Sequence, residues 1–404
     1  MSSANVPDAR LRWMDYARRS MQRIGFVKWL LSLCSASHTQ TLESLTRSFY
    51  SAITEVKALG ADRDIFYAYV QQQRLYRRYK GVEDEAQIQD IRLSDPALPS
   101  HTGAITGELD RKGYRHAVYV EIPTWASRLH LVRQENYTLT DRGRALVLAG
   151  RDKTGQSANT LLLTLPEKYI FLFSLLATDG DFISALYSQL LDRTLFTRDD
   201  AAELVLGTLQ SIRSDKIVSR VSSGQFQEYR RRLDKAIEAV KRQRGDGLGP
   251  KESIVTPRVE PLVDCGILRK PFADRYEYAF TSWGRAFLRS LASADSVTDF
   301  LDTGLAAEMA AATEDASVTR PTMHDLEPAY SSLKSGMGYV SLQELALLAS
   351  AQALSSPEKQ AFEIKAIEQL LRETASNGDR QIRFAAGRMG GPSQVRIDPK
   401  AFSQ

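Results

Sequence analysis

Apolar residues recur at helical spacing along most of the chain. In residues 8–33, for example, Leu11, Met14 and Met21 fall on one stripe while several arginines fall on other faces. The same spacing predicts further helices over residues 41–58, 62–78, 165–177, 182–191, 198–211, 226–244, 342–353 and 362–374. Apolar residues alternate over 381–397, which predicts a hairpin. We therefore expect a mainly α-helical protein with small β-hairpins.

One stretch of the chain occurs twice. Residues 137–146 (Tyr-Thr-Leu-Thr-Asp-Arg-Gly-Arg-Ala-Leu) and 278–287 (Tyr-Ala-Phe-Thr-Ser-Trp-Gly-Arg-Ala-Phe) share Tyr, Thr, Gly, Arg and Ala at matching positions. The first residues of each copy alternate like a strand, and Thr140 or Thr281 can cap a helix that follows. The repeat therefore predicts a strand, a turn and a helix in each half of the chain.

The repeat resembles the end of a prokaryotic winged-helix domain, in which a wing strand reads Tyr-x-Leu-Thr and leads into a helix with Gly-Arg-x-Leu. Upstream of the second copy, residues 257–270 resemble the recognition helix, its Gly end and the first wing strand, so the resemblance covers about residues 250–291. Upstream of the first copy, residues 122–133 lack that Gly. The resemblance implies tandem winged-helix modules, which bind duplex DNA, pair with each other or dock proteins.

Composition places the chain among globular proteins with more than one domain. Its 404 residues are 43% hydrophobic and 25% charged, and the net charge of +4 is too small to indicate a partner by itself. The longest apolar runs are shorter than a membrane span, and the N-terminus shows no signal sequence. Cys34 and Cys265 stand alone, without disulfide or zinc spacing. These features predict a cytoplasmic protein.

The most polar linker, residues 151–158, marks the clearest domain boundary. We expect four parts. They are an N-terminal helical and winged-helix module (1–150), a second winged-helix module with inserted basic helices (159–292), a connecting helix and linker (293–328), and a C-terminal helix-helix-hairpin unit (329–404). The last unit is either a third, minimal winged unit or a plain helical cap.

Several basic clusters are candidates for binding nucleic acid. One ends the helix predicted over 62–78, where basic residues alternate with tyrosines, and another fills the helix predicted over 226–244. Each cluster has a simpler interpretation, either as charge that complements a helix dipole or as a solvated helix face. The candidate residues, including those of the recognition-like helix and its wing, are Arg74, Arg77, Arg78, Lys80, Arg128, Arg230, Arg231, Lys241, Arg242, Arg244, Thr256, Arg258, Arg269, Lys270 and Arg275.

Catalytic motifs are weak by comparison. The five histidines have no metal-ligand spacing, and residues 387–392 lack the Lys-Ser/Thr of a phosphate loop. Arg111 and His116 have the Arg-x4-His spacing of some helical ribonucleases, but in a strand-prone context. We expect no catalytic residue, cofactor or metal. A helical nuclease would require His116 to face Arg111 across a cleft.

Two functions therefore compete. The first is duplex DNA binding through tandem winged helices, as a regulator or as the DNA-engaging subunit of a prokaryotic defence or chromosome-maintenance assembly. The second is a structural subunit whose winged helices make protein contacts and a homodimer. The position of the recognition helices distinguishes them, because helices packed inside the protein, together with arginines paired with acids, favour the structural subunit.

Overall fold

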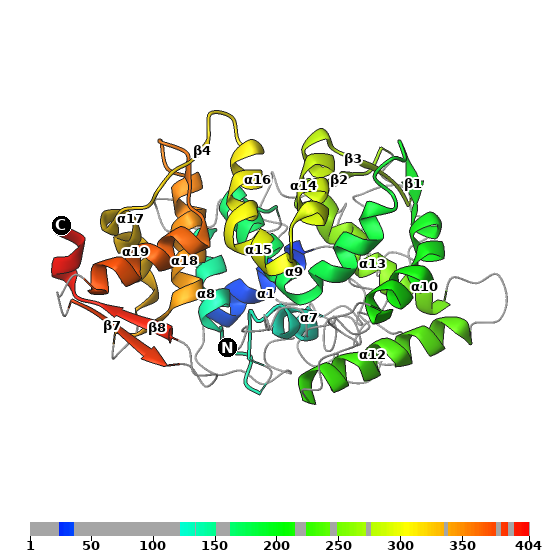
Figure 1. The fold of residues 1–404 in the computed structure, drawn as a ribbon, viewed down its shortest axis with the longest axis horizontal. Helices are drawn as coiled ribbons and strands as arrows, with labels where there is room; N and C mark the ends of the chain where they lie inside the picture. Colours follow the sequence, from blue (N-terminus) through cyan, green and yellow to red (C-terminus); the bar gives the residue numbers. More distant parts are fainter. Residues whose placement is uncertain are drawn as a thin grey trace, which may run out of the picture.

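The computed structural model describes residues 24–35, 122–133, 135–150, 162–214, 224–242, 249–271, 276–334, 338–376, 381–386 and 392–403 (Figure 1). The helices expected over 41–58 and 62–78, and most of the one expected over 8–33, lie outside these ranges. Over the residues that are described, the protein is mostly helical with a few short strands, as expected.

Helices make up the body of the protein. They are α1 (Gly25–Ser35), α7 (Ile122–Arg128), α8 (Asp141–Ala149), α9 (Leu165–Ser188), α10 (Arg198–Ser214), α12 (Gly224–Lys241), α13 (Gly249–Asp264), α14 (Ser282–Ser293), α15 (Val297–Asp299), the π-helix η5 (Phe300–Gly304), α16 (Leu305–Ala311), α17 (Met323–Leu333), α18 (Leu342–Leu354), α19 (Ile364–Ser376) and the 3-10 helix η6 (Pro399–Ser403). The strands are β1 (Phe196–Thr197), β2 (Leu268–Arg269), β3 (Glu277–Phe280), β4 (Ser317–Val318), β5 (Val340–Ser341), β6 (Gln360–Ala361), β7 (Ile382–Ala386) and β8 (Pro392–Ile397).

The same order of elements occurs in two parts of the chain. Helix α9 is followed by strand β1, helix α10, helix α13 and the β2–β3 hairpin, and the sheet has the order β1-β3-β2. Helix α17 is likewise followed by β5, α18, α19 and the β7–β8 hairpin, with the order β5-β8-β7, and the additional strand β6 between α18 and α19 pairs with β4. In both, the first short strand pairs with the last strand of the unit. Helix α12 lies between α10 and α13 and has no counterpart in the C-terminal series, whereas the sequence suggests that the helices over 198–211 and 226–244 are both inserted.

The C-terminal unit begins earlier than the expected boundary at residue 329. That boundary falls inside α17, which packs against α18 and η6 as the first helix of the unit. The C-terminal unit lies toward one end of the molecule and β1, α10 and α12 lie toward the other, with α9 near the centre (Figure 1).

The first copy of the repeat has the same local geometry as the second, although it lacks the Gly. Helix α7 ends with a bond from Leu131 N to Ala126 O of 2.8 Å, and α13 ends with one from Ile267 N to Leu262 O of 2.9 Å. The residue just before each donor has a left-handed backbone conformation. It is His130 (φ 58°) in the first copy and Gly266 (φ 85°) in the second. A histidine can therefore hold this turn, at the steric cost that glycine avoids.

Among the matching residues of the repeat, Thr and Gly have the same structural role in both copies. The Oγ1 atoms of Thr140 and Thr281 accept hydrogen bonds from Gly143 N (3.1 Å) and Gly284 N (2.8 Å), which caps α8 and α14. The tyrosines are not equivalent. Tyr137 has a left-handed backbone (φ 52°) in a turn, outside any strand, whereas Tyr278 is buried on strand β3.

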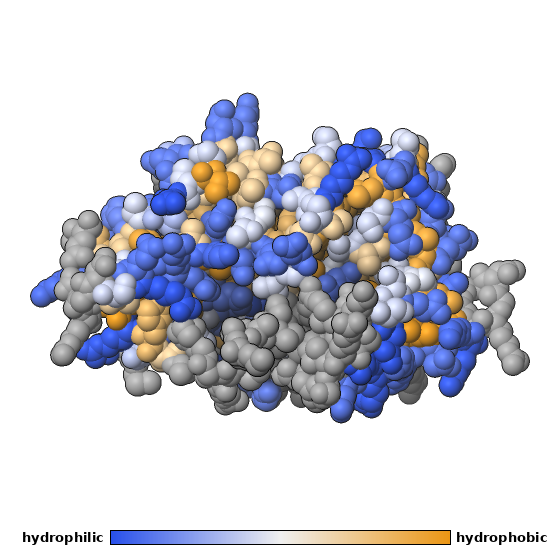
Figure 2. Space-filling view, in the orientation of Figure 1, coloured by the Kyte–Doolittle hydropathy of each residue, from blue (hydrophilic) through white to orange (hydrophobic). Residues whose placement is uncertain are grey.

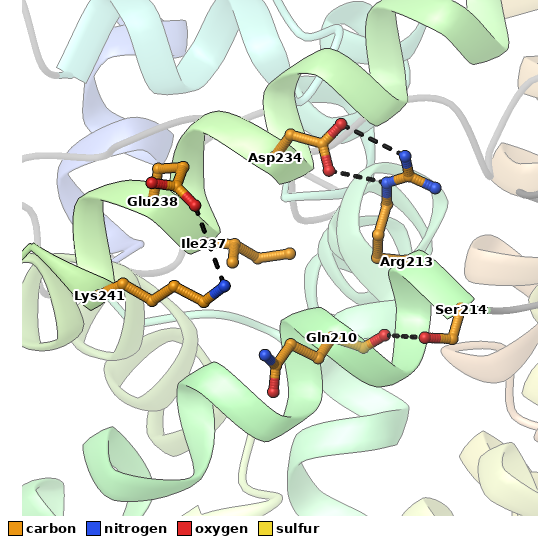
Figure 3. A pocket seen from close by; sticks show the side chains of 7 residues that line it. All are labelled: Gln210, Arg213, Ser214, Asp234, Ile237, Glu238 and Lys241. Atoms are coloured by element: carbon orange, nitrogen blue, oxygen red, sulfur yellow. Dashed lines mark hydrogen bonds and ion pairs between the residues drawn. The ribbon is translucent and has the colours of Figure 1, made fainter.

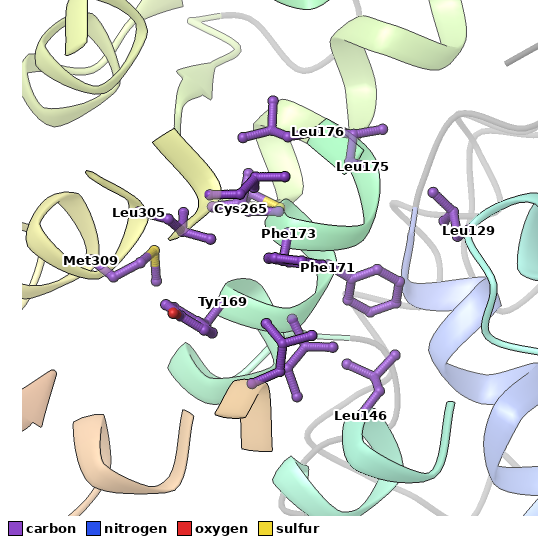
Figure 4. Packing of buried hydrophobic residues seen from close by; sticks show 14 of the residues in the cluster. Leu129, Leu146, Tyr169, Phe171, Phe173, Leu175, Leu176, Cys265, Leu305 and Met309 are labelled. Atoms are coloured by element: carbon purple, nitrogen blue, oxygen red, sulfur yellow. The ribbon is translucent and has the colours of Figure 1, made fainter. Parts of the chain in front are cut away.

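Helix α9 is the centre of the hydrophobic core. It packs against α8, α10, α14 and α18, and its aromatic and leucine side chains meet Leu146 of α8 and Leu305 and Met309 from farther along the chain (Figure 4). Among the described helices, α9 alone is long and apolar enough to cross a membrane, but 78% of that apolar window is buried inside the protein. Its apolar length therefore serves the core.

Replacing either repeat glycine by alanine is expected to destabilise the fold. A Cβ on Gly284 would lie 1.9 Å from the carbonyl oxygen of Ile267, and one on Gly143 would lie 1.9 Å from that of Leu131. The backbone would have to move, and overpacking of this kind costs about 1–3 kcal/mol. Gly207→Ala in α10 is the control, since nothing lies within 4 Å of its Cβ and helix propensity favours Ala. Denaturant unfolding should separate them, and equal effects would contradict the close-approach argument.

Candidate nucleic-acid interface

The helix expected to read DNA is enclosed by the rest of the protein. Every residue of α13 from 254 to 262 is buried, with α10 packed along the helix and α12 also in contact with it. Thr256 is 2% exposed and Arg258 is 0% exposed. The prediction that these two side chains contact phosphate or guanine is therefore wrong, because neither reaches the surface of this fold.

Arg258 instead forms an internal ion pair. Its Nε contacts Asp179 Oδ2, its guanidinium also donates to the carbonyl of Ile254, and it lies 4.8 Å from the ring centroid of Phe182. Asp179 occupies a break in α9 (φ −144°, ψ 19°), at the turn that the sequence predicts between two helices. A buried guanidinium requires such partners, because an unpaired charge in an apolar interior is very costly.

Lys270 is at the base of the hairpin, but its ammonium points inward. Its side chain is 8% exposed and lies 3.4 Å from Glu260 Oε1, which also accepts a 2.7 Å hydrogen bond from the hydroxyl of Tyr278. The ammonium is 5.2 Å from the ring centroid of Tyr276, which the guanidinium of Arg198 also covers at 4.0 Å. Lys270 therefore neutralises a buried carboxylate, and its predicted contact with DNA is wrong for this arrangement.

Helix α12 carries the exposed part of the predicted basic surface. Arg231, Lys241 and Arg242 are exposed and Arg230 is half-buried, and hydrophilic residues cover this region of the surface (Figure 2). Glu238 lies 3.9 Å from both Lys241 and Arg242, so it offsets part of their charge. Glu238 therefore reduces the local positive field, and contact of these cations with nucleic acid stays a prediction.

A groove of about 470 Å³ runs between α10 and α12 (Figure 3). Arg213 of α10 and Asp234 of α12 pair at 2.7 Å on one side, and Lys241 and Glu238 lie on the other, with Ile237 between them. Acids and bases are balanced in the groove. It is therefore not a strongly positive channel for nucleic acid.

The remaining candidates are scattered or lie outside the described residues. Arg269 is exposed on β2, and Arg128 is half-buried at the end of α7. Six candidates lie outside the described ranges, namely Arg74, Arg77, Arg78, Lys80, Arg244 and Arg275. Arg111 and His116, the pair considered for a nuclease, also lie outside them.

Buried ion pairs between distant segments were not predicted from the sequence. Arg142 of α8 donates to Glu344 Oε1 at 3.1 Å and to Gln343 Oε1 at 2.7 Å, so it joins the first repeat to the C-terminal unit. Lys28 of α1 likewise pairs with Glu167 of α9 at 2.9 Å. The partners are far apart in the sequence, and no local motif marks them.

Within the ranges that the structure describes, no group of three His, Cys, Asp or Glu side chains is placed to hold a metal ion. Both cysteines are buried, and burial raises the pKa of Cys34 to about 12, so its thiol stays protonated at neutral pH.

Comparison with known proteins identifies no relative. No family model matches the chain, and no curated protein or solved structure matches it.

A group of carboxylates lies where η5 packs on α19. Burial, followed by Glu368 and Asp299, raises the pKa of Asp302 to about 6, while Lys365 acts in the opposite direction. Burial also raises the pKa of Glu368, and Arg372 opposes this. Because the pKa of Asp302 is higher in the folded than in the unfolded state, its contribution to stability is fully present below about pH 4 and is lost as pH rises through about 6.

Removing one partner of the Arg258–Asp179 pair should destabilise the protein strongly. Arg258→Met leaves a buried carboxylate without this cation, and such losses cost about 3–5 kcal/mol. The double variant Asp179→Leu with Arg258→Met removes both charges and should recover most of that loss. Urea unfolding of the wild type, Arg258→Met, Asp179→Leu and the double variant measures the coupling. Additive effects of the two single changes would contradict a direct pair.

Asp302→Asn should raise the melting temperature at pH 7.5 by about 2 °C, because it removes a carboxylate that the folded state holds at a cost. The gain should shrink as pH falls through 6 and be lost near pH 3, where Asp302 is protonated in both the folded and the unfolded state. The exposed Asp295→Asn variant is the control and should show no comparable pH-dependent gain. A gain that is independent of pH would contradict the titration of Asp302.

Proposed function

We propose that the protein is a structural subunit of a larger assembly, built from winged-helix units that pack on one another and present their outer faces to protein partners. The observation that carries this proposal is the burial of α13 from residue 254 to 262. A helix that reads a major groove must expose base-contacting side chains, and this one lies within the core.

The order of elements supports winged-helix units. In the second and the C-terminal units, a helix, a short strand, two further helices and a hairpin follow one another, and the short strand pairs with the last strand. The first repeat has a helix, a left-handed residue, an isolated bridge between Val132 and Leu139, and a capped helix. These arrangements match the end of the same unit.

The C-terminal counterpart of α13 also suits a protein contact better than a DNA contact. Helix α19 exposes Lys365, Gln369 and Arg372, but Glu373 is exposed beside them and Glu368 is half-buried. A face of mixed charge does not provide the consistent positive potential that phosphate binding requires. It is typical of a solvated or protein-contacting helix.

Packing between the units favours a single rigid body. Helix α8 packs against both α9 and α18, and the buried pair between Arg142 and Glu344 holds the first repeat against the C-terminal unit. A buried ion pair adds little net stability, but mispairing it is costly, so it specifies how the parts fit together. Units locked in this way suit a subunit that supports other proteins.

Duplex DNA binding is the second candidate, and one observation favours it. Helix α12 exposes Arg231, Lys235, Lys241 and Arg242, and residues 224–242 contain six basic and three acidic side chains. Such a helix could contact phosphates without reading bases. The protein would then bind duplexes of any sequence with a steep dependence on salt.

Purification of the tagged full chain from its native source should bring down a protein partner in fixed stoichiometry. The complex should survive nuclease treatment, because protein contacts would hold it together. A protein that behaves as a monomer after nuclease treatment, at any salt concentration, would overturn the assembly role. Mass spectrometry of the eluate and light scattering of the purified complex supply the measurement.

Titration with two duplexes of unrelated sequence at 50 and 200 mM salt provides the matched test. We expect equal affinities for the two sequences, because α13 is enclosed. A preference of 1,000-fold or more, typical of specific binding, would contradict the structural role of α13. Replacing the four exposed cations of α12 by glutamine tests the second candidate, which requires a loss of affinity in that variant.

A further inference from the structure

Two arginines face each other across the C-terminal hairpin. Strands β7 and β8 are antiparallel, and their register places Arg383 directly opposite Arg396. Both side chains are exposed. The pairs on either side, Ile382 with Ile397 and Phe384 with Val395, contribute to the opposite face of the sheet, which packs on the core. The outward face therefore carries the arginine pair.

The strands contain no charge that would offset this pair. Neither β7 nor β8 has an acidic residue, and within the described residues neither arginine forms an ion pair. Like charges directly opposite each other weaken a strand pair. Asp398, just beyond β8, accepts a 3.0 Å hydrogen bond from Lys400 N with its Oδ1. Strands β7 and β8 thus carry a positive pair on an exposed face, and the exposed carboxylate of Asp398, two residues beyond Arg396, offsets part of its charge.

We propose that this face binds the phosphodiester backbone of a nucleic acid. A guanidinium group is planar and can donate two parallel hydrogen bonds to the oxygens of one phosphate. The sheet fixes the separation of the two arginines. The carboxamide of Gln394, exposed on the same strand as Arg396, adds a neutral donor of the kind that contacts phosphates. Binding of this kind carries no sequence information.

The chemistry of the face favours a phosphate backbone over an acidic peptide. Protein interfaces obtain most of their affinity from apolar and aromatic side chains buried in pockets. On this face, Arg383 alternates with Ala385 on β7, and Gln394 with Arg396 on β8, so neither of these two strands places a large apolar side chain there. The inference does not rest on the assembly role, because it uses neither α13 nor the packing between units.

Arg383→Glu gives opposite expectations for binding and stability. The substitution replaces a repulsive cross-strand pair by an attractive one, so the melting temperature of the full chain should stay equal or rise. Affinity for a fluorescent 20-mer, duplex or single-stranded, at 50 mM salt should fall about tenfold, with a decrease of about one to two in the salt slope. Arg289→Glu on α14 is the matched control, since Arg289 is exposed and the change in net charge is identical.

Three outcomes would overturn the inference. One is the absence of binding to any 20-mer at 50 mM salt. Another is an equal loss of affinity in the Arg383→Glu and Arg289→Glu proteins, which would indicate a general charge effect. The third is displacement of the 20-mer by a poly-glutamate peptide at matched charge, which would assign the face to an acidic protein. Each of these outcomes differs from a failure of the assembly role. That role is tested separately, by whether a stoichiometric protein complex survives nuclease treatment.

Discussion

A guanidinium inside a protein must keep a partner for its charge, and the arrangement of the second unit depends on this requirement. Arg258 is fully buried on α13 and pairs with Asp179, which lies at the break in α9. The pair therefore connects the central helix of the core to the helix that the sequence suggests as a DNA reader. If Arg258 turned outward to a DNA groove, the carboxylate of Asp179 would remain in the apolar interior without its cation. The fold therefore requires α13 to stay packed in the core.

Close approach of backbone is the second constraint, and it explains why the repeat is visible in the sequence. The helix after each hairpin passes so near the carbonyl group of Leu131 or Ile267 that only a residue without a Cβ fits at Gly143 and Gly284. A threonine three residues earlier caps the helix in both copies. Tyrosine matches in the sequence but not in the structure, because the first hairpin turns before Tyr137 can join a strand.

Charge in this protein is divided between the interior and two separate surfaces. Arg142, Lys28, Arg258 and Lys270 neutralise buried or half-buried carboxylates and so hold elements together. The cations of α12 and the arginine pair of the C-terminal hairpin remain at the surface, near opposite ends of the molecule (Figure 1). Net charge alone cannot separate these roles, since a cation contributes equally to it whether it is buried or exposed.

Local patterns in the sequence predict α9, α10, α12, α18 and α19, the C-terminal hairpin and the Thr-x-x-Gly turn, because apolar spacing and capping act over a few residues, whereas α17 is not predicted. Tertiary structure alone decides that Arg258 and Lys270 turn inward, that His130 replaces a glycine, and that Arg383 meets Arg396. Each of these depends on a neighbour supplied by another segment, such as Asp179 or Glu260. The identity of that neighbour is settled when the chain packs, because burial of a charge selects the partner that neutralises it.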